Sequence, residues 1–172
     1  GVRSIEDCRT LLRTGADKIT INTQACSTPE IITEAAKIYG AQCVVVSIQA
    51  KRKDNQSWEA YNQNGRERTK MDVTAWAKEV VSRGAGEILL TSIDQDGTRK
   101  GLDYELIETV LSSVNVPVIV GGGVGSIDDV VRAAHLGASG ITIAHMLHFK
   151  SINLVNLKNK LLQEDVDIRI SK

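Results

Sequence analysis

The sequence predicts an α/β fold on a parallel sheet, with about five strands and six helices in a single domain. The runs VVVSI, EILLTS and PVIVG are apolar on both faces, as strands covered by other elements on both sides must be. Helix-patterned segments alternate with these runs, and strand–helix–strand units form parallel sheets. A Gly-Ala pair precedes four of the five predicted strands, and a glycine just past a helix end supplies a left-handed cap.

The predicted elements follow one another closely along the chain. Pro117 lies in the fourth strand, which ends in three glycines, and Ser126 before two aspartates is a typical helix start. The predicted strands cover residues 18–22, 43–48, 87–92, 116–120 and 140–144. The predicted helices cover residues 4–14, 29–39, 72–83, 104–114, 126–136 and 152–163.

The composition narrows the classes of partner. Aromatic residues are only 3% of the 172 residues, so the core must be built from aliphatic side chains. The net charge is zero and no polybasic run is present, which argues against binding of nucleic acid or of an anionic membrane. The three cysteines lack disulfide-framework and zinc-site spacing, and no apolar run approaches the roughly 18 residues of a membrane span. A cytoplasmic protein with reduced thiols is expected.

An internal repeat organises the chain. Residues 1–23 and 123–145 align without a gap at an offset of 122, and 10 of 23 positions are identical. A strand precedes the glycine-containing loop of the second copy, whereas the first copy begins at that loop. Closing a (β/α)8 barrel takes eight strands, so five predict an incomplete barrel. We expect either part of a longer barrel or one whose open edges another subunit covers, as in a homo-oligomer.

Residues 51–70 interrupt the alternation of strands and helices. The segments 58–61 and 66–69 flank the sequence Asn-Gln-Asn-Gly at 62–65, which favours a hairpin turn. The insertion follows the carboxyl end of a strand, the edge that carries the active site in parallel barrels. Two interpretations stay open, a lid or substrate-contacting flap and a hairpin without a role in binding.

Five segments resemble one enzyme family closely. They are GADKITINT, QCVVVSIQAKR, GAGEILLTSIDQDGT, VPVIVGGGVGS and HFKSINLVNLKNKL, and the third is the most specific. They resemble the cyclase subunit of imidazole glycerol phosphate synthase, from residue 1 to about residue 170, starting just after the family's third strand. The resemblance implies a (β/α)8 TIM barrel, a lyase of histidine biosynthesis. That family combines ammonia from a glutaminase partner with a ribulosyl aminoimidazole carrying two phosphates, and neither a metal nor a redox cofactor is implied.

The second copy of the repeat predicts a phosphate site. Residues 121–125, here called the glycine loop, lead into the helix at Ser126. Glycine N–H groups approach anions closely, and a helix N-terminus adds a positive dipole. The alternative is a tight turn without a ligand. The loop contributes Gly121, Gly122 and Gly123, and the resemblance adds Gly97, Thr98, Ala144 and His145, the last at a place where the family usually has a serine.

The first copy predicts a phosphate site of its own at the matching strand end, here called the first phosphate site, and that of the second copy is called the second phosphate site. Asn22 and Thr23 follow the strand there, and the loop at Gly1 takes the place of the glycine loop. Two copies of one motif explain two phosphates on one substrate. The alternative for Asn22 and Thr23 is a role in capping a helix or forming a turn.

Lys18 and Glu87 both follow the glycine of a Gly-Ala pair by three residues, so both begin strands. The amino-terminal edge of a parallel barrel usually serves stability. The resemblance implies that these two residues help to gate ammonia entry and that Asp17 faces the glutaminase. The alternative is a plain structural ion pair.

Two positions bear on catalysis. Asp96 follows a strand in SIDQDGT, where a carboxylate suits a sugar hydroxyl or a proton transfer, or simply caps the loop. Gln49 stands in IQAKR where the family has an essential aspartate, as in IDAKR. Glutamine exchanges no proton near neutral pH, and general acid–base steps contribute about 10²–10⁴-fold. The family's partner aspartate on its first strand has no counterpart here, so poor cyclisation by the chain as it stands is expected.

The leading prediction is therefore a barrel of this cyclase family in histidine biosynthesis. One alternative is a divergent relative that amidates a sugar in surface-polysaccharide synthesis. Another is a non-catalytic module that binds phosphate or a partner, which Gln49 favours. A sugar isomerase on the same fold is the third, and the segment GAGEILLTSIDQDGT argues against it.

Overall fold

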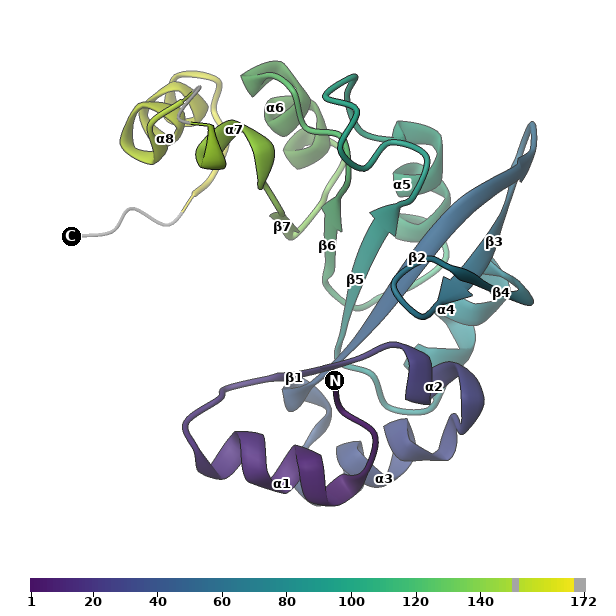
Figure 1. Ribbon diagram of the computed structural model, residues 1–172. Coiled ribbons are helices and arrows are strands. Elements are labelled where there is room, and N and C mark those ends of the chain that lie inside the picture. The colour runs from purple at the N-terminus through teal and green to yellow at the C-terminus, as the bar shows by residue number, and fades with distance from the viewer. Residues whose placement is uncertain (150–151, 169–172) are drawn as a thin grey trace.

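The computed structural model describes residues 1–149 and 152–168, which form an α/β fold (Figure 1). Its parallel strands are β1 (Ile19–Ile21), β2 (Val44–Asp54), β5 (Glu87–Ser92), β6 (Val118–Gly121) and β7 (Gly140–Ile141). An antiparallel hairpin consists of β3 (Ser57–Asn62) and β4 (Glu67–Asp72). The helical elements are α1 (Ile5–Arg13), α2 (Thr23–Ser27), α3 (Glu30–Tyr39), the short 3-10 helix η1 (Ala41–Cys43), α4 (Val73–Ser82), α5 (Tyr104–Leu111), α6 (Ile127–His135), α7 (His145–His148) and α8 (Leu154–Gln163).

The predicted parallel α/β class is confirmed, and β2 lies at the centre of the sheet. The first half of β2 pairs in parallel with β1, and the strands β5, β6 and β7 follow on its other side. Since all five run in the same direction, their carboxyl ends lie at one edge of the sheet. Within the described residues the sheet is open, with β1 and α1 at one end and β7 and α8 at the other (Figure 1).

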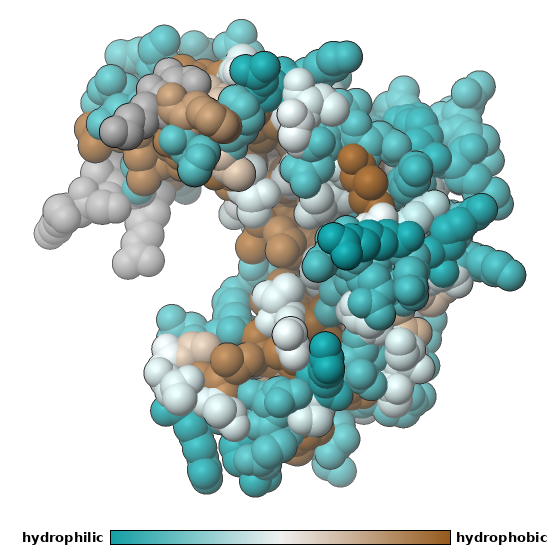
Figure 2. Space-filling view, viewed as in Figure 1, coloured by the Kyte–Doolittle hydropathy of each residue, from teal (hydrophilic) through white to brown (hydrophobic). Residues whose placement is uncertain are grey.

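The two faces of the sheet differ in burial. Val46, Ile88 and Val120 pack into the main core with helical residues, and their side chains are 0% exposed. Burial of each such side chain contributes about 1.5–3 kcal/mol. The alternating residues Ser47 and Leu89 are partly exposed on the opposite face, and Figure 2 shows a hollow between the two ends of the sheet. No helix in the described part of the chain is both long enough and apolar enough to cross a membrane.

The internal repeat is visible as repeated local structure. Helices α1 and α6 both begin with a capping box, in which a serine hydroxyl and an aspartate carboxylate satisfy the first N–H groups. The short helices α2 and α7 begin at Thr23 and His145, which the offset of 122 relates. The sequence did not predict these two helices, because four or five residues are too few to show a helical period. Strand β7 is also shorter than predicted, since the chain leaves the sheet after Ile141.

The second half of β2 forms a three-stranded antiparallel extension of the sheet with β3 and β4. Strand β2 continues past the parallel region, and its second half pairs with β3. Gln63, Asn64 and Gly65 have φ angles of 50°, 59° and 78°, the left-handed region that Asn and Gly adopt most readily. The base of the hairpin is tied to the start of α5, where Trp58 Nε1–H donates to Asp103 Oδ2 at 2.9 Å. The turn therefore has a fixed position relative to the sheet.

Candidate functional site

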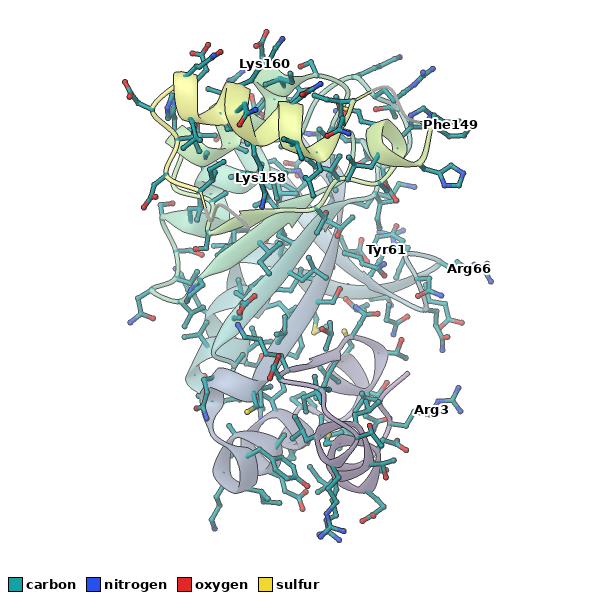
Figure 3. All side chains as sticks on the ribbon, turned by 90° about the vertical axis from the view of Figure 1, so that its left-hand side faces the viewer. Arg3, Tyr61, Arg66, Phe149, Lys158 and Lys160 are labelled. Atoms are coloured by element: carbon teal, nitrogen blue, oxygen red, sulfur yellow. The ribbon has the colours of Figure 1, made fainter. Side chains whose placement is uncertain are left out.

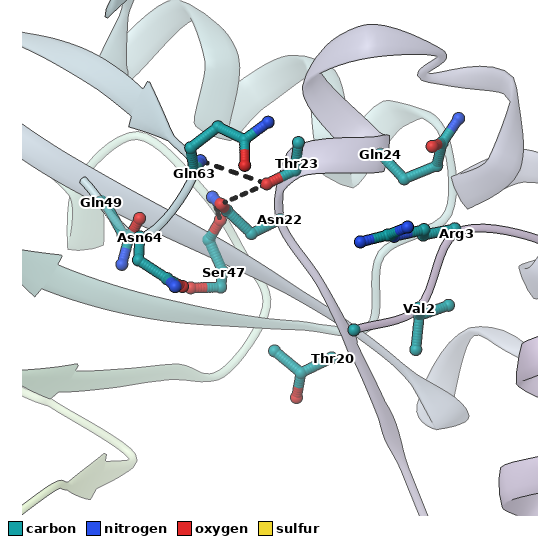
Figure 4. Close-up of a pocket in the computed structure, with 11 residues that line it drawn as sticks. Val2, Arg3, Thr20, Asn22, Thr23, Gln24, Ser47, Gln49, Gln63 and Asn64 are labelled. Carbon is teal, nitrogen blue, oxygen red and sulfur yellow. Dashed lines mark hydrogen bonds between the residues drawn. The ribbon is translucent and has the colours of Figure 1, made fainter. Parts of the chain in front are cut away.

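A cavity of about 620 Å³ lies at the carboxyl end of β1 and at the end of the parallel part of β2 (Figure 4). Four residues that the sequence predicted for ligand binding or catalysis line this cavity: Gly1, Asn22, Thr23 and Gln49. The turn residues Gln63 and Asn64 line it too, as a substrate-contacting flap at residues 51–70 would, and that role stays a prediction. The lining also includes residues that the sequence did not indicate, namely Thr20, Ser47, Gln24, Arg3 and Val2. Thr20 and Ser47 lie two residues before Asn22 and Gln49, so the two-residue period of a strand could have found them.

Hydrogen bonds hold Asn22 and Thr23 in place. The Asn22 side-chain amide donates to the carbonyl oxygens of Ser47 at 2.9 Å and Tyr61 at 3.3 Å, which joins β1 to β2 and β3. The Thr23 hydroxyl donates to Asn22 Oδ1 at 3.4 Å and accepts from the Gln63 N–H at 3.1 Å. These bonds fix both side chains at the mouth of the cavity without any charged group.

Gln49 has an incomplete set of partners. Its Oε1 atom is buried and accepts no hydrogen bond from any described residue. The side chain points into the cavity beside Asn64 (Figure 4). Polar and uncharged side chains make up most of the lining, and Arg3 is the only charged side chain that the described residues contribute to it. The described lining thus offers many hydrogen-bonding groups and no carboxylate to act as a base.

The glycine loop lies at the carboxyl end of β6, on the same edge as the cavity. Gly122 and Gly123 are buried and have φ angles of 91° and 102°. A Cβ atom on Gly123 would lie 2.2 Å from the Gly101 carbonyl oxygen, and the Gly101 N–H donates to the Gly123 carbonyl at 2.9 Å. Close packing of two loops therefore requires glycine here, whether or not an anion binds.

The N–H groups of residues 122–126, from the glycine loop to the start of the helix, fall into two sets. Those of Gly125 and Ser126 donate to Asp129 Oδ2 at 2.9 Å and 2.8 Å. Burial tends to raise the pKa of Asp129, but its hydrogen bonds outweigh that effect and hold the pKa below the usual value. Within residues 1–149 and 152–168, residues 122–124 donate no main-chain hydrogen bond. Buried N–H groups are nearly always paired, so this set favours an external acceptor such as a phosphate oxygen.

The other residues predicted for the second phosphate site are dispersed around the glycine loop. Gly97 is exposed on the loop after β5, outside the lining of the cavity. Asp96, predicted for a substrate hydroxyl or a proton transfer, is exposed beside it and also lies outside that lining. The Thr98 hydroxyl donates to the Gln95 carbonyl at 2.7 Å, so it stabilises that loop's own turn. His145 begins α7, immediately after Ala144. Its Nδ1 atom is buried and unpartnered among the described residues, and its ring lies 4.4 Å from the Phe149 ring, centroid to centroid.

The two candidate phosphate sites face the same side of the molecule. Figure 3 shows Arg3, the hairpin residues Tyr61 and Arg66, and Phe149 at the end of α7 along one side. Arg3 belongs to the loop before α1, and Tyr61 to the strand that leads into the hairpin turn. The mouth of the cavity at Arg3 and the end of α7 at Phe149 therefore lie on the same side of the molecule.

Lys18 and Glu87 form an ion pair at the opposite, amino-terminal edge of the sheet. Glu87 begins β5 and is buried, whereas half of the Lys18 side chain is exposed just before β1. The pair spans the central strand β2, on which Val45 lies opposite Glu87. Asp17 is exposed beside the pair. The geometry is that of the predicted pair, and its role in ammonia entry stays a prediction.

Comparison with known proteins gives the family. A family model described as "Histidine biosynthesis protein" matches residues 1–153. The chain belongs to this family. It is 44% identical over 170 residues to the imidazole glycerol phosphate synthase subunit HisF of Dictyoglomus turgidum. The aligned residues make up 99% of this chain and 68% of the relative. The same subunit of Pyrobaculum aerophilum is 45% identical over 170 residues, or 99% of this chain and 67% of the relative.

A third relative, from a Hydrogenobaculum species, carries the same name and is 44% identical over 171 residues, covering 99% of this chain and 68% of its own length. The predicted membership in this family is thereby confirmed. The family model and the names of the relatives both refer to histidine biosynthesis, so the alternative of surface-polysaccharide amidation is not favoured. Membership in the family also supports the (β/α)8 barrel class to which the five parallel strands contribute.

Proposed function

We propose that this chain carries the substrate-binding edge of an imidazole glycerol phosphate synthase cyclase in histidine biosynthesis. The substrate is a ribulosyl aminoimidazole with two phosphates, which extends between the ends of β1 and β6. One phosphate binds at Asn22 and Thr23, and the other binds at the glycine loop. Ala144 and His145 lie at the start of α7, the counterpart of α2, and contribute to the second site.

One observation carries this proposal. The same loop, capping box and short helix occur twice, and both copies end at the same edge of one parallel sheet. The first copy borders a cavity lined by hydroxyl and carboxamide groups. The second presents three successive N–H groups without a partner in the described chain. Such a pair of sites suits a ligand with an anionic group at each end.

We further propose that ammonia arrives from the other edge of the sheet. Lys18 and Glu87 pair at the amino-terminal edge, and Asp17 is exposed there, where a glutaminase partner can contact it. The two reactants then approach from opposite edges, so the partner does not block the phosphate sites. Asp96 is exposed on the loop that packs against the glycine loop, where it is available to contact a sugar hydroxyl of the substrate.

Calorimetric titration with two probes tests the two-phosphate proposal. Without ammonia, we expect the ribulosyl aminoimidazole bisphosphate to bind at least about tenfold more tightly than ribose 5-phosphate at constant ionic strength. A second set of charge-assisted hydrogen bonds contributes about 1.5–3 kcal/mol, and 1.4 kcal/mol corresponds to a factor of ten. Equal affinities for the two probes, or no binding of either, would contradict the proposal.

A further inference from the structure

The turn of the β3–β4 hairpin forms one wall of the cavity. Gln63 and Asn64 at this turn line it together with Asn22 and Thr23 from β1 and α2 (Figure 4). The Gln63 N–H donates to the Thr23 hydroxyl at 3.1 Å across 40 residues of sequence. The hairpin turn is thus hydrogen-bonded directly to a residue of the first phosphate site.

The same turn also lies close to Gln49. A Cβ atom on Gly65 would lie 4.0 Å from Gln49 Oε1, so the turn approaches the buried end of that side chain. No described residue donates a hydrogen bond to this oxygen. Leaving a buried acceptor unpaired costs free energy, and buried polar groups almost always have a partner. A ligand N–H or O–H inside the cavity would supply the missing donor.

Contacts at the base of the hairpin keep the turn in place. Arg52 donates to Asp103 at 2.9 Å and to Glu105 at 2.8 Å, and its guanidinium lies 4.6 Å from the centre of the Trp58 ring. Trp58 and Asp103 are both buried, and Asp103 also caps α5 through the Leu106 N–H. A turn fixed at its base in this way can present side chains to a ligand in a defined geometry.

We propose that Gln49, Gln63 and Asn64 form a carboxamide cluster that determines specificity by binding the hydroxyl and N–H groups of the ligand beside its first phosphate. Each carboxamide both donates and accepts hydrogen bonds, which suits the mixed groups of a sugar. The phosphate itself binds at Asn22 and Thr23. The inference rests on the proposed function, since it uses the same cavity, and it assigns the hairpin a role as a specificity-determining element.

The test compares two probes on the whole chain by calorimetry, inorganic phosphate and ribose 5-phosphate. In the wild type we expect ribose 5-phosphate to bind about tenfold more tightly, because one or two additional hydrogen bonds form with the sugar. Gln49→Leu and Asn64→Gly should each reduce this ratio by about threefold or more while leaving the affinity for inorganic phosphate within about twofold. Glycine tolerates the positive φ at position 64, so the turn is retained.

Asn55→Gly is the matched control. Asn55 is exposed in the other turn of the extension, between β2 and β3, and does not line the cavity. This variant should keep the wild-type ratio. If both cavity variants also keep that ratio while phosphate still binds, the carboxamide cluster is wrong and the proposed function survives. If the wild type binds neither probe, the first phosphate site and the cluster both fail.

Discussion

A Gln49→Asp variant should raise ammonia-dependent cyclisation by about 10²-fold or more, because a carboxylate in this position can exchange a proton. Gln49 lines the cavity near the end of the parallel part of β2, and its register places it opposite Thr91 of β5 and Tyr61 of β3. The family resemblance assigns an essential aspartate to this position. The assay uses a chain joined to the first three strands of the family, so that the partner aspartate is supplied as well.

The control for this prediction is Gln49→Asn. Asparagine has the shape of aspartate but exchanges no proton, so any gain that comes from a shorter side chain alone would appear in both variants. We expect turnover to rise in the aspartate variant and to remain at the wild-type level in the asparagine variant. Equal rates for the two variants, or a wild type that already reaches the rate of the aspartate variant, would show that Gln49 does not limit the chemistry.

A Gly123→Ala variant should lose stability severely. The backbone at Gly123 has a φ of 102°, and an added Cβ would lie 2.2 Å from the Gly101 carbonyl oxygen and 2.9 Å from Gln95. Alanine would therefore strain the backbone at position 123 and displace the loop that contains Gln95 and Gly101. We expect the clash to cost at least about 2 kcal/mol beyond the backbone strain. Urea denaturation measures the change in the free energy of unfolding.

Gly137→Ala separates the two contributions. Gly137 has a φ of 98°, almost the same as that of Gly123, but a Cβ there would meet nothing within 4 Å. The free energy of unfolding of this control should fall only by the cost of placing alanine in that backbone conformation, about 1–3 kcal/mol. If both variants lose the same amount, the contact between the two loops does not hold the glycine loop in place.

Much of the fold could be predicted from the sequence because its signals are local. All six predicted helices are present, and so are the five parallel strands, since apolar runs and glycine stops mark them independently of their partners. The antiparallel hairpin also occurs where Asn-Gln-Asn-Gly favours a turn. Helices α2 and α7 were missed because their few residues carry no period, although the offset of the repeat relates them.

The candidate site was less predictable, because its geometry depends on contacts between distant segments. The two-residue period of β1 and β2 places Asn22 and Gln49 on the face of the sheet that borders the cavity. The sequence had identified both as candidate site residues. The contribution of Gln63 depends on a hydrogen bond across 40 residues, which no local pattern reveals. Asp96 has the residue type and the loop position of a site residue, but its side chain is exposed outside the cavity lining. The functional assignments of these residues remain predictions.

One edge of the sheet is expected to hold two anions in related loops. Equilibrium dialysis with radiolabelled inorganic phosphate measures the stoichiometry directly. We predict two bound phosphates per chain, and one in a Thr23→Val variant, whose side chain keeps its shape but loses the hydroxyl at the mouth of the cavity. A wild-type stoichiometry of zero, or a single phosphate that the Thr23→Val variant retains, would contradict the account.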